Sequence, residues 1–171
     1  MATRKGSKPT KLPDKKAVHA ALSAALAKAL LTMAAVAEDA RKGATHEENR
    51  SEGDKDMRAT EQSYVARGQA MRTEQLAEDV ARFESIPVRT FAPTDRIATG
   101  ALVRVRIDDE PRVFFLCAQG GGTELEVSGT KITVLTPASP AGRAVIGKEV
   151  GDDFELAAGG RTRSWEIEEL G

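Results

Sequence analysis

The chain has 171 residues, which is enough for one domain or two small modules. Its 25 Lys and Arg residues are balanced by 26 Asp and Glu residues, so bulk charge indicates no affinity for nucleic acid or membranes. Cys117 is the only cysteine, which excludes an internal disulfide and a CxxC metal site. Cys117 lies in an apolar run, and we expect it to be a buried, inert strand residue. His19 and His46 are too far apart to indicate a zinc motif.

Residues 1–12 consist largely of Lys, Gly, Ser, Thr and Pro, a composition typical of a disordered basic arm. Such an arm is either a solvated tail or a weak contact for nucleic acid or another acidic surface. The Ala/Leu-rich run from Ala20 to Ala37 imitates a secretory signal, but Lys28 interrupts it and the arm before it is long and polar. We expect no stretch long and apolar enough to span a bilayer, and therefore a cytoplasmic protein without a membrane partner.

Two long helices are predicted next. Pro13 and Asp14 form a start signal, with Asp14 as the N-cap, and the first helix is expected to end near Lys42. The second is expected from Asp56 to Glu84. The expected apolar stripes recur at three-to-four-residue spacing, and comprise Leu22, Leu26, Leu30, Met33, Val36 and Ala40 in the first helix and Met57, Tyr64, Met71, Leu76, Val80 and Phe83 in the second.

Neither helix can bury its stripe alone. An antiparallel coiled-coil hairpin over residues 13–85 satisfies both stripes, with arms of roughly 40 Å at 1.5 Å per residue. Ser85-Ile86-Pro87 ends the hairpin, because a residue before proline avoids the helical region.

Residues 86–171 show strand patterns instead. Alternating or apolar runs predict strands at 101–107, 112–118, 124–127, 132–135, 154–156 and 164–167, forming a small antiparallel sheet with Trp165 as a core anchor. Gly120 to Gly122 form a loop and no phosphate-binding motif, since GK[ST] and a following helix are missing. The chain as a whole is therefore expected to be α+β.

The segment SPAGRAVIGKEVGD, residues 139–152, combines several local signals. Pro140 suits a turn or a first helical position. Arg143 to Ile146 supply one short amphipathic turn, which Gly147 ends, and Lys148 follows where a helix dipole favours a cation.

This segment resembles the C-terminal domain of the bacterial Gre transcript-cleavage factors, which carry a very similar SPxGRAxxGKxVGD string. The resemblance implies an FKBP-like fold for residues 86–171 that docks on RNA polymerase. The candidates for this contact are Ser139, Pro140, Gly142, Arg143 and Lys148. Pro140 and Gly142 can equally serve only to shape the turn. Arg143 is the better contact, because a guanidinium can pair bidentately with a carboxylate.

Acidic residues gather in GATHEENRSEGDKD, residues 43–56, between the two predicted helices. One interpretation is a solvated turn in which Asp54 or Asp56 caps the second helix. The Gre resemblance implies instead that this tip enters the secondary channel of RNA polymerase, where carboxylates help to hold Mg²⁺ and the attacking water. The catalytic candidates are then Glu47, Glu48, Asp54 and Asp56.

The resemblance further implies that the polymerase performs the hydrolysis. The protein itself would then be no enzyme, would hold no metal stably alone, would share Mg²⁺ with the polymerase active centre, and would contact nascent RNA and DNA only indirectly. The family's tip reads GDLxENxEY. Setting Glu48-Asn49 on its EN pair places Thr45 at the leading acid, which is therefore missing. This departure predicts weak or altered cleavage, or an inhibitor that competes with Gre factors.

Two other classes of function remain open from the sequence. An FKBP-like prolyl isomerase would need a deep aromatic-lined pocket, but this domain has few aromatic residues and several of them occupy core-like strand positions. A structural coiled-coil adaptor would make the acidic tip incidental.

Overall fold

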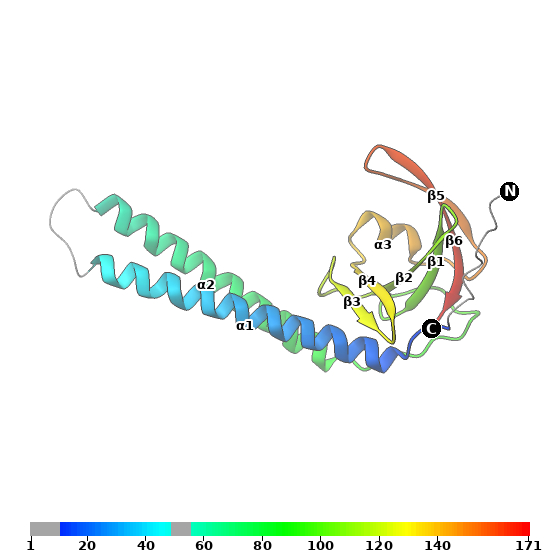
Figure 1. Cartoon of the computed structure of the whole chain (residues 1–171), viewed down its shortest axis with the longest axis horizontal. Helices are drawn as coiled ribbons and strands as arrows, with labels where there is room; N and C mark the ends of the chain where they lie inside the picture. The colour runs from blue at the N-terminus through cyan, green and yellow to red at the C-terminus, as the bar shows by residue number, and fades with distance from the viewer. Residues whose placement is uncertain (1–10, 49–55) are drawn as a thin grey trace. The chain divides into compact units, whose positions relative to one another are not determined.

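A computed structural model describes residues 11–48 and 56–171 of the chain (Figure 1). They form two compact units, one made of residues 11–22 and 88–171 and the other of residues 23–87. Helix α1, Lys15–Glu48, runs through both units, and helix α2, Asp56–Ser85, belongs to the second.

Helix α1 begins as predicted and ends later. The Asp14 carboxylate accepts a hydrogen bond from the Ala17 N–H at 3.3 Å, which confirms Asp14 as the N-cap. The helix continues past the expected end near Lys42 to Glu48. A single glycine such as Gly43 costs a helix only about 1 kcal/mol relative to alanine, so the helix-forming residues on both sides carry it through.

The inward face of α1 differs from the expected stripe at one position. Val36 is 49% exposed, and Ala37 takes the place predicted for it. The spacing then alternates strictly between four and three residues, as a heptad requires. Buried or partly buried positions in this order are Leu26, Leu30, Met33, Ala37, Ala40 and Ala44.

The stripe expected in the first half of α2 is wrong at Tyr64 and Met71, and the side chain of Met57 lies outside the described residues. Tyr64 and Met71 are 72% and 61% exposed, so these seven-spaced residues lie away from the partner helix. Smaller side chains fill the seam instead, which allows two backbones to approach closely. The prediction for Leu76, Val80 and Phe83 is confirmed. The partly buried or buried seam positions are Ala66, Gln69, Thr73, Leu76, Val80 and Phe83.

The two helices run antiparallel within the second unit (Figure 1). Near one end, the Ser23 hydroxyl donates a hydrogen bond to a Glu84 carboxylate oxygen at 3.0 Å. Further along, Ala34 and Ala37 of α1 line a shallow groove together with Ala66 and Ala70 of α2. Residue numbers rise along one helix as they fall along the other, which confirms the predicted antiparallel pairing.

Helix α1 corrects one expectation about apolar length. Its Lys15–Ala44 stretch is long and apolar enough to cross a membrane by length and composition, with a mean hydropathy of 1.8 in the best window. The prediction that no stretch meets this criterion was therefore wrong. Core helices of soluble proteins and signal sequences meet it as well, and only 11% of this window is buried.

The first unit contains a six-stranded sheet with the order β3-β4-β2-β1-β6-β5. Its strands are β1 Leu102–Ile107, β2 Glu110–Leu116, β3 Glu124–Val127, β4 Thr130–Leu135, β5 Asp153–Ala158 and β6 Arg161–Leu170. Compared with the predicted runs, β5 and β6 are longer at both ends, and β2 and β4 begin two residues earlier. In contrast, β1 begins one residue later, β2 ends two residues earlier, and β3 matches its prediction.

All neighbouring strands pair antiparallel except β2 and β4, which are parallel. The expected purely antiparallel sheet is thus corrected to a mixed one. Strands β3 and β4 form a hairpin, and β4, not β3, lies beside β2. The connection from β2 therefore passes the position of β4 before β3 begins.

The short helix α3, Pro140–Val145, contributes to the core on one sheet face (Figure 1). Val145 packs there with inward residues of β1 and β6 such as Val105 and Ile167. Trp165 is 7% exposed, and its ring stacks on Phe114 with centroids 5.5 Å apart. This confirms Trp165 as a core anchor.

Cys117 follows β2 and is buried, as predicted. Burial raises the pKa of its thiol. A protonated, enclosed thiol is a poor nucleophile, which agrees with an inert role.

Candidate functional site

The acidic segment between the helices is only partly described by the structure. Asp54 lies outside the described residues. Glu47 and Glu48 belong to the last turn of α1, and Asp56 is the first residue of α2. The predicted turn from Gly43 is therefore wrong in its first part, because residues 43–48 are helical.

Helix electrostatics separate these acids into two kinds. A carboxylate at a helix N-terminus is stabilised by about 0.3–1 kcal/mol, and one in the last turn is disfavoured by the negative end of the dipole. Asp56 therefore occupies a position that helix stability alone explains. Glu47 and Glu48 occupy positions that helix stability does not favour.

Metal binding has no preformed site in the described part of the chain. Within residues 11–48 and 56–171, no three His, Cys, Asp or Glu side chains gather in a way that could hold a metal ion. The side chains of the tip candidates are not among those described.

The segment of residues 139–152 is built around the N-terminus of α3. The Ser139 hydroxyl accepts a hydrogen bond from the Gly142 N–H at 3.0 Å and donates one to the Thr136 carbonyl at 2.8 Å. Pro140 occupies the first helical position, as the sequence indicated. Two of the five proposed contact residues therefore stabilise the start of α3: Ser139 caps the helix, and Pro140 fixes its first turn.

Gly142 occupies a position where no side chain fits. A Cβ atom added there would lie 2.0 Å from the Thr136 carbonyl oxygen, well inside any possible contact. The glycine in this motif is therefore required by the close approach of two backbone segments, and its buried position leaves it little to offer a partner.

The end of α3 is tied to the segment before β1. Gly147, with a φ of +82°, donates its N–H to the Ile97 carbonyl at 2.8 Å, and the Ile97 N–H returns a bond to the Lys148 carbonyl at 2.8 Å. The predicted stop at Gly147 is confirmed. The Lys148 ammonium lies 4.6 Å from the centre of the Phe154 ring, in a cation–π contact.

Arg143 is the exposed cation of this segment. Its guanidinium reaches the Ala138 carbonyl through one nitrogen, which holds the side chain over the N-terminal turn of α3. Arg143 is exposed, and a guanidinium carries more N–H donors than this one hydrogen bond uses.

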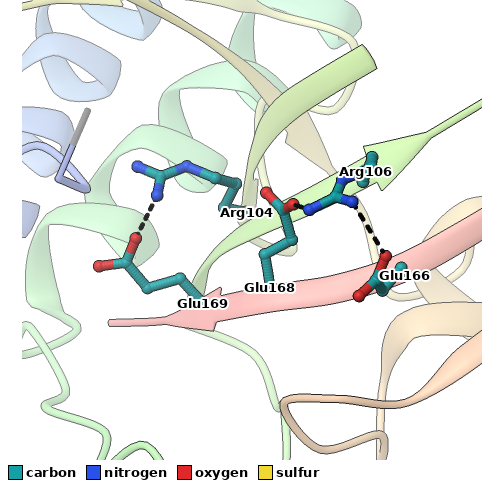
Figure 2. A network of polar contacts seen from close by, with 5 residues as sticks. All are labelled: Arg104, Arg106, Glu166, Glu168 and Glu169. Carbon is teal, nitrogen blue, oxygen red and sulfur yellow. Dashed lines mark hydrogen bonds and ion pairs between the residues drawn. The ribbon is translucent and has the colours of Figure 1, made fainter. Parts of the chain in front are cut away.

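A charged network on β1 and β6 was not predicted from the sequence (Figure 2). Arg104 pairs with Glu169 at 2.5 Å, and Arg106 pairs with Glu166 at 3.6 Å and also with Glu168. The carboxylates of Glu168 and, less strongly, Glu166 raise the pKa of the Arg106 guanidinium. The register shifts between Arg104 and Val105, which lets Glu168 reach the same side as its neighbours.

A signal for this network exists in the sequence. Arginines at alternate positions of one strand and the acid-rich ending EIEEL complement each other. Which strands are neighbours had to be known before the two patterns could be matched.

The chain is similar in sequence to GreA transcription elongation factors from several bacteria. No family model matches the chain. The transcription elongation factor GreA of Mesorhizobium japonicum is 36% identical over 96 residues, which cover 56% of this chain and 58% of that protein. GreA of Brucella anthropi is 39% identical over 99 residues, with the same two coverages. The chain thus spans little more than half the length of these curated relatives.

Solved structures resemble the chain only distantly. The GreA factor homolog Gfh1 of Thermus thermophilus covers 87% of this chain at 16% identity, with a TM-score of 0.37. A GreA/GreB elongation factor from Nitrosomonas europaea covers 57% at 24% identity, with a TM-score of 0.35. The relationship therefore rests on the sequence matches. Over the matched part of its length, this chain is similar to the GreA transcription elongation factors.

Proposed function

We propose that the protein is a transcription elongation regulator that binds RNA polymerase at its secondary channel. The observation that carries this proposal is the 36–39% identity to GreA elongation factors over more than half of the chain. Because the match spans 58% of those relatives, polymerase binding and its consequences are proposals for this chain. A cytoplasmic location follows from such a role.

The division of labour between the units supports this assignment. The antiparallel helices with their four-three seam are suited to a coiled-coil rod, and the acidic segment lies between their ends. We infer that the sheet-containing unit, with an FKBP-like fold, docks on the polymerase, and that the rod carries the acids to the active centre.

The docking contact is assigned to Arg143, supported by Lys148. Ser139, Pro140 and Gly142 then act mainly by shaping the surface that presents Arg143, as their hydrogen bonds and close contacts indicate. A guanidinium with free N–H groups fits an acidic polymerase surface.

The function of the tip is assigned to Glu47, Glu48, Asp54 and Asp56. Glu47 and Glu48 stand at the unfavourable end of a helix dipole, a placement that helix stability does not explain and that a cation-binding role does. Mg²⁺ belongs to the polymerase in this proposal, and the tip adds the hard carboxylate oxygens that this ion prefers.

The experiment adds the protein to a stalled, backtracked elongation complex and follows RNA length. Replacing the four tip acids by Ala should abolish the effect on RNA and leave polymerase affinity within a few fold. A control carrying Glu74→Ala and Glu78→Ala, on the exposed surface of α2, should behave like the wild type. Equal activity of the tip variant and the wild type would establish the solvated-turn interpretation instead.

A second candidate function is inhibition of polymerase or competition with Gre factors without cleavage. It is favoured by Thr45, which stands where the family's leading acid is expected. One carboxylate lost near a catalytic metal typically costs orders of magnitude in rate. Thr45→Asp should therefore increase cleavage. Strong cleavage by the wild type would argue against the inhibitor, and no gain from Thr45→Asp would argue against this alignment of the tip.

A further inference from the structure

The first turn of α1 holds a lysine in an unusual setting within the sheet-containing unit. The Lys15 ammonium donates a hydrogen bond to the Arg89 carbonyl at 2.6 Å and lies 4.4 Å from the centre of the Phe91 ring. The Arg89 guanidinium lies 4.6 Å from the same ring centre. Phe91 is 6% exposed and packs in the core, so the ring that both cations share is fixed in place. We call these three residues the Lys15 clasp.

The charge balance of the Lys15 clasp disfavours a second cation. Phe91 offers a ring face and Arg89 a carbonyl oxygen, but the structure gives Lys15 no ion pair with any described carboxylate. The nearest acid in sequence, Asp14, directs its carboxylate to the Ala17 N–H. Lys15 is also the first residue of α1, whose first turn contains no acid and whose dipole repels cations there. Lys16 and His19 add no negative charge.

Burial and then the Arg89 guanidinium lower the pKa of Lys15 to about 8. At pH 7.5 roughly a quarter of such amines are neutral, against roughly one in a thousand for an ordinary lysine. A less basic amine is also less nucleophilic, by about tenfold if it follows the dependence known for thiols. The gain in neutral amine exceeds that loss.

We propose that the Lys15 amine is an acylation site that reacts with acyl phosphates in preference to the exposed lysines of this chain. The neutral Nζ attacks the carbonyl carbon of the acyl phosphate and forms an amide bond. The bond from that carbon to the phosphate oxygen breaks, phosphate leaves with the electron pair, and a proton passes from Nζ to solvent. No atom is oxidised or reduced.

The product fits the Lys15 clasp. An amide keeps one N–H, which can still donate to the Arg89 carbonyl, and it removes the charge that competes with Arg89 for the Phe91 ring. Acylation therefore relieves a repulsion and preserves a hydrogen bond. The modification lies in the unit of residues 11–22 and 88–171, at the first residue of α1, and it alters no residue of the unit of residues 23–87.

The test treats the full chain with acetyl phosphate and measures acetylation at each lysine by peptide mass spectrometry. At pH 7.5 Lys15 should react about tenfold faster than Lys16, its neighbour in α1, and Lys28, which is exposed on the same helix. The rate at Lys15 should level off above about pH 9, as its lowered pKa requires, and the rates at Lys16 and Lys28 should still rise. A Lys15 rate at pH 7.5 no higher than that of Lys16 would overturn the proposal.

A variant tests the role of the clasp itself. Arg89→Gln removes the neighbouring cation and keeps the backbone carbonyl, so acetylation of Lys15 at pH 7.5 should fall severalfold and that of Lys16 should stay unchanged. Arg112→Gln, which removes an exposed arginine of the same unit that pairs with exposed Glu110, should alter neither rate. Circular dichroism confirms that both variants fold. An unchanged Lys15 rate in folded Arg89→Gln would overturn the assignment.

Discussion

At the residue scale, the contribution of an ion pair to stability depends on how deeply its charged groups are buried. Arg104 is 8% exposed, whereas Arg112 and its partner Glu110 both lie on the surface. A buried guanidinium that loses its partner remains desolvated, but an exposed one is compensated by water. The same type of pair therefore has different consequences at the two places.

Removing the carboxylate beside Arg104 should destabilise the protein. Glu169→Gln is expected to lower the free energy of unfolding by about 1–2 kcal/mol, since Glu169 is itself partly exposed. Glu110→Gln should change it by less than about 0.5 kcal/mol. Urea denaturation of the two variants provides the comparison, and equal effects would contradict a special role for the Arg104 pair.

Lys15 should make stability depend on alkaline pH. Its folded-state pKa of about 8 lies below its ordinary 10.5, so between these values the unfolded chain binds more protons. Stability then rises with pH through this window, because folding is no longer opposed by the charge. Lys15 is partly exposed, so solvent screening reduces the effect to the order of 1 kcal/mol.

The free energy of unfolding is measured as a function of pH for the wild type and for Lys15→Gln. Subtracting the second curve from the first removes the contributions of other titrating groups. We expect the wild type to gain stability relative to the variant from pH 8 to 10. A difference that stays flat, or that falls over this range, would contradict the lowered pKa.

At the scale of elements, the turn before α3 depends on one missing side chain. Gly142→Ala would force a Cβ atom to 2.0 Å from the Thr136 carbonyl oxygen, which requires the backbone to move. We expect a loss of at least 2–3 kcal/mol in unfolding free energy, typical of severe overpacking.

The matched control is a glycine with free space around it. Gly68 lies inside α2 with no atom within 4 Å of an added Cβ, so Gly68→Ala should stabilise the protein by about 0.5–1 kcal/mol. Thermal denaturation of both variants checks the pair. A mild effect of Gly142→Ala would mean that Thr136 and Ser139 can yield, and would return Gly142 to the set of partner contacts.

At the scale of the whole molecule, our proposal gives polymerase docking to the sheet-containing unit and the effect on RNA to the acids between the two helices. Arg143→Ala should weaken binding to RNA polymerase by about 1–3 kcal/mol if its partner is desolvated. Arg112→Ala, on the exposed surface of the same unit, should leave affinity unchanged. Direct binding to core polymerase measures both, and full affinity of Arg143→Ala would show that the docking surface lies elsewhere.

Local chemistry in the sequence determined where most elements lie and how they begin and end. Asp14 caps a helix, Pro140 starts one and Gly147 ends one because each acts through its own backbone or a near neighbour. Alternating or apolar runs likewise predicted all six strands. The resemblance to Gre factors came from the same local string, whose glycine and serine the structure explains by close packing and capping.

Tertiary structure decided which of several possible faces became buried. Tyr64 and Met71 keep heptad spacing as well as Ala66 and Thr73 do, and only the neighbouring helix selects the smaller set. The parallel pairing of β2 with β4, and the meeting of Arg104 with Glu169 or of Lys15 with Arg89 and Phe91, join residues far apart in the chain. Such contacts depend on chain topology, which periodicity and capping do not specify.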